Sequence, residues 1–284
     1  MEIITYNPQK CKFCGLCATV CINEVINQKK GAVPQIVRPE KCILCGHCVA
    51  VCPNDAITHN RMDIGHFRPI REGAVAADEM ENLLCAKRSV RHFSGKPVRK
   101  DVLERIVNVA RMSPSVSNRQ DRGFIVVSDP ALLQKIEDEI VTHYRRLLLV
   151  LNPPLRKILS LVMPRAAKEL EKAATKFNTL LRQAEKRQNP VLRAAPAVVL
   201  IHGPKTNAAS RDDCLAAQHY LMLLAQTIGL GTCINGFIQF APAALEKLLD
   251  IPKGHRIFAA TTVGYPRYKY IKTVDRKPAD VRYM

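Results

Sequence analysis

Two cysteine-rich stretches of identical spacing lie near the start of the chain. Each has the pattern C-x2-C-x2-C-x3-C, and corresponding cysteines are 31 residues apart. The sequences continue alike, with CINEVI after the first stretch and CPNDAI after the second. The eight cysteines are Cys11, Cys14, Cys17, Cys21, Cys42, Cys45, Cys48 and Cys52. An internal repeat that carries eight thiols indicates a duplicated metal-binding unit, and it constrains the first part of the chain more than any other feature.

The spacing within each stretch favours an iron–sulfur cluster. Three thiolates separated by two residues can converge on three corners of a cube, and the fourth cysteine points toward the cube of the other stretch. This crossed pattern predicts two [4Fe-4S] clusters. The first would be held by Cys11, Cys14, Cys17 and Cys52, and the second by Cys42, Cys45, Cys48 and Cys21.

Zinc sites and disulfides are the alternatives to clusters. A zinc site needs only four ligands and seldom shows two complete four-cysteine runs. Disulfides need an oxidising compartment, and residues 1–10 contain no apolar segment for export, so a reducing, cytoplasmic location is expected. The first stretch has Ile22 where the second has Pro53. This departure leaves the prediction intact because that proline is not a ligand.

Residues 1–60 resemble the bacterial two-cluster ferredoxins. The resemblance implies a small βαβ-type domain that carries single electrons and performs no chemistry on a substrate. The connector that follows, residues 61–75, contains Gly65, Pro69 and Gly73 and has no periodic pattern, so it reads as a linker. Residues 76–284 are then long enough to form a second domain with its own core.

The charge balance limits the choice of partners. The chain has 43 Lys and Arg against 25 Asp and Glu, a formal charge of +18. Such a surface suits nucleic acid, an anionic membrane, or an acidic redox partner such as ferredoxin or flavodoxin. Nucleic acid is disfavoured because no recognition module is present, aromatics are only 5% and Trp is absent. No uncharged apolar run reaches 18 residues, so no membrane span is expected.

Helical and strand-like patterns alternate in the second part, which predicts an α+β domain. Asp129 and Pro130 have the pattern of a helix start, and Gly229 that of a left-handed helix end. The segment 141–190 is the least regular and reads as a divergent helical insertion or a lid. Within it, residues 141–165 mix apolar and basic side chains, which fits a lid, a membrane-surface patch or ordinary core packing. Further helices are expected at 76–88, 100–112, 166–188 and 212–228, and strands at 123–128, 197–202 and 256–263.

A group of cations with one hydroxyl follows the first of these helices, in the motif KRSVRHFSGKPV at residues 87–98. Lys87, Arg88 and Arg91 with Ser89 offer the charged donors that bind a phosphate monoester. A solvated basic helix end is the alternative, since cations also favour that end of the helix dipole.

Three further motifs follow this group: SPSVSNRQ at 113–120, GLGTCINGF at 229–237, and VGYPRY with DRKP between 263 and 278. Their order resembles the nitroreductase family of FMN enzymes over residues 80–284. With the leading domain, the chain resembles the ferredoxin–nitroreductase fusion proteins. The resemblance implies a homodimer in which a central mixed sheet is flanked by helices and FMN lies at the subunit interface.

The resemblance also assigns residues to FMN. Lys87, Ser89 and Arg91 would bind its phosphate and ribityl chain, with Arg91 near the N1 edge. The partner subunit would contribute a loop, and the backbone N–H groups of Asn235 and Gly236 would lie near N5 and O4, where donors tune electron acceptance. The full set is Lys87, Arg88, Ser89, Arg91, Pro114, Ser115, Asn118, Asn235, Gly236 and Arg276. No catalytic side chain is expected, because the flavin is the reactive group.

The chain departs from this family pattern at two places. Lys87 stands where arginine is common, and Gln120 is followed by Asp121 and Arg122 instead of proline and an aromatic residue. The second change leaves the acceptor open. Of the remaining cysteines, Cys85 and Cys214 are expected to be small buried side chains, and Cys233 lies in the expected flavin loop, where a thiol could contact FMN.

The preferred hypothesis is an FMN-dependent oxidoreductase of nitroreductase type. Its clusters would pass single electrons to FMN, which would reduce a nitroaromatic, a quinone or an activated alkene. Reduced ferredoxin or NAD(P)H would be the donor, and the absence of a G-x-G-x-x-G motif means that a nicotinamide would meet the flavin directly. The alternative is an electron-relay subunit that docks an acidic redox partner and has no small substrate of its own.

Overall fold

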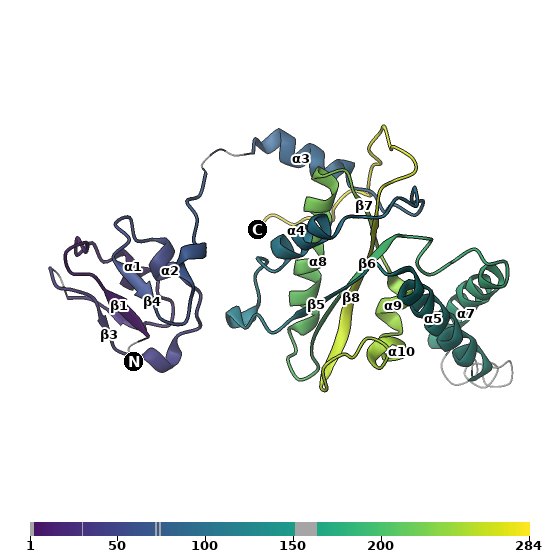
Figure 1. The fold of residues 1–284 in the computed structure, drawn as a ribbon, viewed down its shortest axis with the longest axis horizontal. Helices are drawn as coiled ribbons and strands as arrows, with labels where there is room; N and C mark the ends of the chain where they lie inside the picture. Colours follow the sequence, from purple (N-terminus) through teal and green to yellow (C-terminus); the bar gives the residue numbers. More distant parts are fainter. Residues whose placement is uncertain (1–2, 30, 72, 74, 151–163) are drawn as a thin grey trace. The chain divides into compact units, whose positions relative to one another are not determined.

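The chain forms two compact units, Met1–Val75 with Val116–Arg119, and Ala76–Ser115 with Gln120–Met284. The computed structural model describes residues 3–29, 31–71, 73, 75–150 and 164–284. Figure 1 shows the helices and strands of both units.

The first unit is built from short elements around the cysteine stretches (Figure 1). Strand β1 pairs antiparallel with β4, and β2 pairs antiparallel with β3. The apolar core is small and includes Ile4, Val25, Ile26 and Ile57. The elements are β1 Ile4–Tyr6, α1 Leu16–Thr19, β2 Ile26–Asn27, β3 Gln35–Ile36, η1 Pro39–Lys41, α2 His47–Ala50, β4 Ile57–His59 and η2 Ile64–His66.

The two copies of the cysteine stretch have similar backbone conformations. Gly15 and Gly46 precede α1 and α2 at φ 79° and 73°, in the left-handed region that glycine tolerates best. Phe13 and Leu44, two residues earlier in each copy, also have positive φ, at 57° and 54°. The internal repeat predicted from the cysteine spacing is therefore confirmed at the level of backbone conformation.

The second unit contains a four-stranded sheet in the order β5-β6-β8-β7. All three ladders among these four strands are antiparallel. In the described residues the parallel pairing seen at this sheet is an isolated bridge between Ser89 and Thr232. The strands are β5 Gly123–Val127, β6 Ala197–Pro204, β7 Gly231–Ile234 and β8 His255–Gly264.

Helices cover both faces of this sheet. Val198 and Leu200 of β6 pack in one apolar cluster with α5, while Val199 and Ile201 pack in another with α4 and α8. This alternation is what a strand buried on both faces must show. The α+β prediction is confirmed. The helices are α3 Ala77–Ala86, α4 Lys100–Ala110, α5 Pro130–Val150, α7 Pro164–Glu185, α8 Ser210–Thr227, α9 Gly236–Phe240 and α10 Ala243–Glu246.

Two of the predicted helix boundaries are confirmed. Helix α5 begins at Pro130, and the Asp129 carboxylate accepts the N–H of Leu132 at 2.8 Å. Gly229, just after α8, has φ 79°. Both helix ends depend on residues at the boundary itself, so they can be predicted from the sequence.

The predicted irregular middle is largely helical where it is described. Val141 and Tyr144 of α5 lie in the core, as the packing alternative required. Residues 151–163, which hold much of the proposed lid or membrane-surface patch, lie outside the described residues. Among the described helices, none has the length and apolar character needed to cross a membrane.

Candidate functional site

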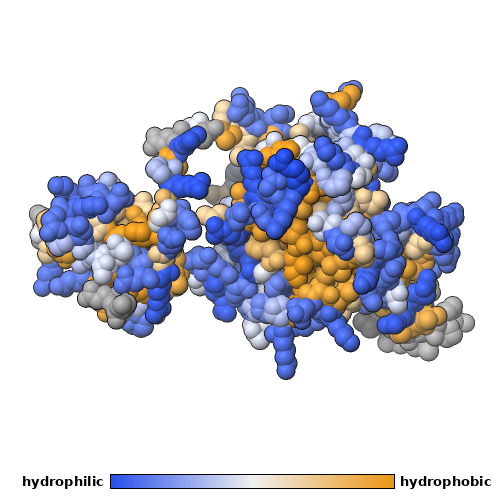
Figure 2. Space-filling model, viewed as in Figure 1, coloured by the Kyte–Doolittle hydropathy of each residue, from blue (hydrophilic) through white to orange (hydrophobic). Residues whose placement is uncertain are grey.

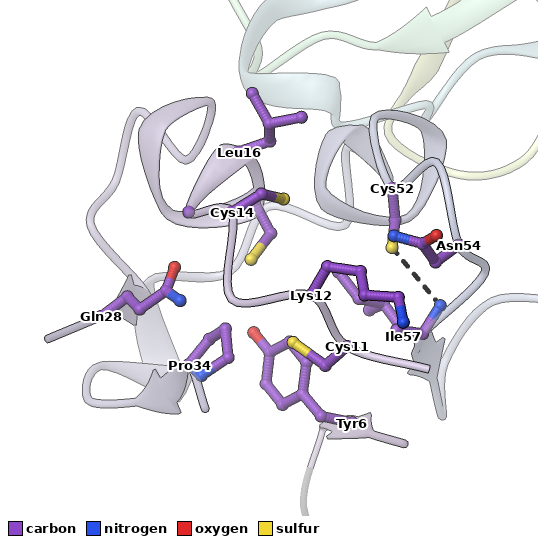
Figure 3. Close-up of a pocket in the computed structure, with 13 residues that line it drawn as sticks. Tyr6, Cys11, Lys12, Cys14, Leu16, Gln28, Pro34, Cys52, Asn54 and Ile57 are labelled. Atoms are coloured by element: carbon purple, nitrogen blue, oxygen red, sulfur yellow. Dashed lines mark hydrogen bonds between the residues drawn. The ribbon is translucent and has the colours of Figure 1, made fainter. Parts of the chain in front are cut away.

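The first unit has a cavity lined by cysteines of both stretches (Figure 3). Cys11, Cys14 and Cys17 come from the first stretch and Cys52 from the second. The phenol of Tyr6 in β1 also lines this cavity. The grouping is the one that the crossed ligand pattern requires.

A second cavity has the reciprocal composition. Cys42, Cys45 and Cys48 come from the second stretch, and Cys21 comes from the first. His59 of β4 lines it too, with its Nε2 3.6 Å from the Cys42 sulfur. The sequence argument missed His59, which lies outside both cysteine motifs and has no spacing signal of its own.

Backbone hydrogen bonds stabilise the sulfur of the fourth cysteine in each stretch. The fourth cysteine of each stretch is already hydrogen bonded, because Val25 N–H and Ala56 N–H donate to the sulfurs of Cys21 and Cys52, each at 3.3 Å. Figure 3 shows the bond to Cys52. Such donors stabilise a sulfur that carries negative charge.

Burial disfavours the thiolate form of two of the cysteines. Burial raises the pKa of Cys17, and burial raises the pKa of Cys48 to about 11. Metal ligation requires thiolates, so cluster insertion at these positions must release protons.

In the second unit, the loop with the KRSVR motif is anchored between two strands. Val90 N–H donates to the Thr232 carbonyl of β7 at 3.0 Å, and Ser94 N–H donates to the Tyr265 carbonyl after β8 at 2.9 Å. Gly231 permits this approach, since a Cβ there would lie 2.6 Å from a Val90 methyl carbon. The cation-bearing loop is thus fixed to the sheet by its backbone.

The predicted phosphate-binding side chains differ in exposure. Lys87 is half-buried and its Nζ donates to the Arg88 carbonyl at 2.8 Å. Burial lowers the Lys87 pKa, and the nearby Cys233 thiol opposes that shift. Arg91 is exposed. The loop therefore presents one partly desolvated and one solvated cation.

A cavity of about 430 Å³ adjoins this loop and brings three predicted residues together. Arg91 lines it from the motif loop, and Asn235 and Gly236 line it from the start of α9. Lys87, Arg88 and Ser89 are not among its lining residues. Cavities of this size hold cofactors and small substrates.

The role predicted for the Asn235 backbone is wrong. Its N–H donates to the Ala260 carbonyl of β8 at 2.8 Å and is therefore committed to the sheet. The side chain is committed as well, because Oδ1 accepts the Ile238 N–H at 3.1 Å and Nδ2 donates to the Val191 carbonyl at 2.8 Å. For Gly236 the role stays a prediction: this residue opens α9, where first-turn N–H groups lack intrahelical acceptors.

The loop expected to reach a partner subunit is held within this chain. The Arg122 guanidinium donates to the carbonyls of Ser113 and Pro114 at 2.5 and 3.3 Å. Ser115 Oγ accepts the Gln120 N–H at 3.1 Å. The departure noted at Arg122 thus has a structural reason, because its side chain stabilises the loop.

Two further predicted residues are not among those that line the cavity. Asn118, in η3 Val116–Asn118, groups with the first unit, where its Nδ2 donates to the Ile43 and Leu44 carbonyls at 3.0 and 2.7 Å. Arg276 lies in the exposed C-terminal segment, and its backbone N–H donates to Asp275. Neither lines the 430 Å³ cavity in this single chain.

The remaining cysteines correct two expectations. Cys214 is fully buried in α8, as predicted, but Cys85 is exposed on α3. Cys233 lies in strand β7 and not in a loop. It is buried and lines the same cavity as Arg91.

Two residues of helix α5 that the sequence argument missed form hydrogen bonds to segments that line the cavity. Glu137 is 3% exposed, and its two carboxylate oxygens accept the N–H groups of Val191 and Leu192, each at 2.8 Å. Burial raises the Glu137 pKa, and the two N–H donors oppose the rise. Two turns further along the same face of α5, Tyr144 donates its hydroxyl hydrogen to the Phe237 carbonyl at 2.8 Å.

The protein is thus an α+β protein with two cysteine-lined cavities in its first unit. Its second unit has a cavity lined by cations beside the sheet. The sequence profile of the nitroreductase family matches residues 85–265, and that of the 4Fe-4S dicluster domain matches residues 3–53. The chain therefore belongs to the nitroreductase family and carries a 4Fe-4S dicluster domain at its start. Both resemblances inferred from the motifs are confirmed.

Individual relatives are distant. An Archaeoglobus fulgidus protein named as an NADH dehydrogenase/NAD(P)H nitroreductase is 24% identical over 196 residues, which cover 67% of this chain and 87% of that protein. Rat iodotyrosine deiodinase 1 is 25% identical over 228 residues, covering 75% of this chain and 71% of the relative.

Solved structures share the fold. A Bacteroides fragilis nitroreductase with bound FMN has a TM-score of 0.57 at 17% identity, covering 72% of this chain and 98% of that one. An iodotyrosine deiodinase bound to FMN and 3-iodo-L-tyrosine has a TM-score of 0.52 at 24% identity, again covering 72% and 98%. At these sequence identities, the similarity shows only that the fold is shared.

Proposed function

We propose that the protein is an iron–sulfur flavoprotein oxidoreductase. Two [4Fe-4S] clusters in the first unit collect single electrons, and FMN in the second unit transfers them to a nitroaromatic, a quinone or an activated alkene. Reduced ferredoxin or NAD(P)H is the donor. The proposal rests chiefly on one observation: two cavities lined by four cysteines each precede a nitroreductase-family unit in one chain.

The residues of the second unit fit FMN. The cations and the hydroxyl of the KRSVR loop suit its phosphate, and Arg91 lines a cavity large enough for part of the ring. The loop is held beside β7 by the bridge between Ser89 and Thr232, so its donors have a fixed place next to the sheet.

When bound, FMN would supply electron transfer to the acceptor, and the chain's own residues would position it. Lys87, Ser89 and Arg91 hold its anionic end. Gly236 offers a backbone N–H at the start of α9, and Cys233 lies beside the ring site. The charge of Arg91 stabilises an electron-rich ring next to it.

We also propose a homodimer. Phe240 of α9 is 81% exposed and Tyr220 of α8 is 42% exposed. Figure 2 shows a broad apolar area over the part of the second unit where Figure 1 draws α8. Large exposed apolar areas mark contact surfaces in soluble proteins. A second copy placed there would cover the open side of the cavity, and Pro114, Ser115 and Asn118 remain the residues proposed to reach a partner's flavin.

The proposed function is tested on protein reconstituted anaerobically with iron, sulfide and FMN. We expect about eight iron atoms and about one FMN per chain, a mass of two chains by light scattering, and reduction of a neutral nitroaromatic. A protein that retains iron but binds no FMN would contradict the oxidoreductase assignment. Full loading without turnover of any acceptor would favour the electron-relay alternative.

Arg91→Gln tests the cofactor placement within the same experiment. Removing the cation beside the ring is expected to weaken FMN binding about tenfold, measured by fluorescence titration of the flavin-free protein. Arg99→Gln is the matched control, because Arg99 pairs with Asp101 on the surface and does not line the cavity. Equal FMN affinity in both variants would exclude Arg91 from the flavin site.

A further inference from the structure

One wall of the 430 Å³ cavity carries charges that the proposed cofactor residues do not use. This wall is a stripe of helix α7 in which Glu169, Lys172 and Lys176 recur at intervals of three and four residues. That spacing places the three side chains on one helical face, which lines the cavity. The stripe therefore belongs to the site and is not only a solvated surface.

The wall carries more positive than negative charge. Lys172 Nζ lies 2.6 Å from a carboxylate oxygen of Glu169, so these two form an ion pair. Lys176 lies one turn further along, and Arg193 lines the cavity from the turn before β6. The wall thus offers two cations beyond the internal pair, which is the minimum that a bound carboxylate needs for recognition from two sides.

The backbone that carries Arg193 is held in an unfavourable conformation. Arg193 and Ala194 have φ 56° and 53°, in the region that non-glycine residues seldom adopt. The turn is fixed by the buried Glu137 carboxylate, which accepts the Val191 and Leu192 N–H groups, and by Asn189, whose side-chain oxygen accepts the Ala194 N–H. Strain that the surroundings maintain in this way is typical of functional sites.

The same turn is coupled to the flavin side of the cavity. Asn235 Nδ2 donates to the Val191 carbonyl at 2.8 Å. Arg193 is therefore positioned relative to Gly236 by a short run of hydrogen-bonded backbone. A ligand bound by Arg193 would lie at a defined place with respect to the proposed ring site.

Aromatic side chains complete the wall. The rings of Tyr144 and Phe177 lie 4.4 Å apart between centroids, and those of Tyr144 and Phe237 lie 5.6 Å apart in an edge-to-face arrangement. All three line the cavity. Such a surface favours a flat aromatic ligand over an extended aliphatic one.

From these contacts we infer that the acceptor is an aromatic compound carrying a carboxylate, which Arg193 and Lys176 bind while the ring packs against Phe177 and Phe237. This inference rests on the proposed function and deepens it. Arg193 and Lys176 are specificity-determining residues in this account and take no part in electron transfer.

The test compares 4-nitrobenzoate with its neutral analogue 4-nitrobenzamide. Binding to the oxidised, FMN-loaded protein is measured by calorimetry, so the result does not depend on turnover. We expect 4-nitrobenzoate to bind about tenfold more tightly, and we expect Arg193→Gln and Lys176→Gln each to remove most of that preference. The affinity for 4-nitrobenzamide should change little in either variant.

Lys168→Gln is the matched control, since Lys168 is exposed on α7 and lies outside the stripe that lines the cavity. Equal affinity for the two compounds in the unmodified protein, or a preference that survives both substitutions, would overturn the inference. Turnover is then scored separately. A protein that binds 4-nitrobenzoate selectively but reduces neither compound would contradict the proposed function while leaving the carboxylate site in place.

Discussion

A double substitution of Cys11 and Cys52 by alanine is expected to leave about four iron atoms per chain, whereas substitution of Cys11 and Cys21 removes nearly all iron. The reason is the crossed grouping of the thiols. Cys11 and Cys52 line the same cavity, so their loss removes one cluster. Cys21 lines the other cavity, so the second pair removes a ligand from each cluster.

The measurement is iron and labile sulfide per chain after anaerobic reconstitution. Cys85→Ala serves as the control, because this thiol is exposed on α3 and lines neither cavity, so its removal should leave the iron content unchanged. If each stretch bound its own cluster, the two double variants would exchange their phenotypes. That outcome would contradict the crossed assignment while leaving two clusters in place.

Glu137→Ala is expected to lower the free energy of unfolding by about 2–5 kcal/mol. The substitution removes the acceptor of two buried backbone N–H groups, those of Val191 and Leu192. Each unsatisfied buried donor costs about 1–3 kcal/mol. Because the same turn carries Arg193 and bonds to Asn235, the variant should also bind FMN and the acceptor more weakly.

Urea unfolding of the second-unit transition, followed by circular dichroism, measures the effect. Asp138→Ala is the matched control, since Asp138 is the next residue of α5 and its exposed carboxylate accepts a bond from Gln134. We expect this control to stay within about 0.5 kcal/mol of the unmodified protein. A loss of similar size in both variants would show that the Glu137 bonds contribute little.

Features encoded within a few residues were predictable. The cysteine spacing predicted the duplicated unit, and Asp129, Pro130 and Gly229 marked helix ends through their own local chemistry. The order of the flavin-site motifs predicted the family. The cysteine and helix-end signals each lie within a short stretch, whereas the family signal lies in the order of several motifs along the chain.

Features assembled from distant residues were not predictable. Glu137 and Asn235 both bond to the turn that carries Arg193, because α5, the turn before β6 and the start of α9 pack together. No pattern in the sequence indicates that these three residues lie close together. The Asn235 N–H was assigned to the flavin because the sequence does not show that Ala260 of β8 accepts it.

The central claim is that electrons pass from the clusters to FMN. It is tested most directly by mixing the FMN-loaded protein anaerobically with a reduced ferredoxin and following the flavin absorbance by stopped flow. The cluster-free Cys11→Ala/Cys21→Ala variant is compared, and reoxidation of chemically reduced flavin by a nitroaromatic should be equal in both. We predict flavin reduction about tenfold or more slower in the variant. Equal rates of flavin reduction in the two proteins would contradict the claim.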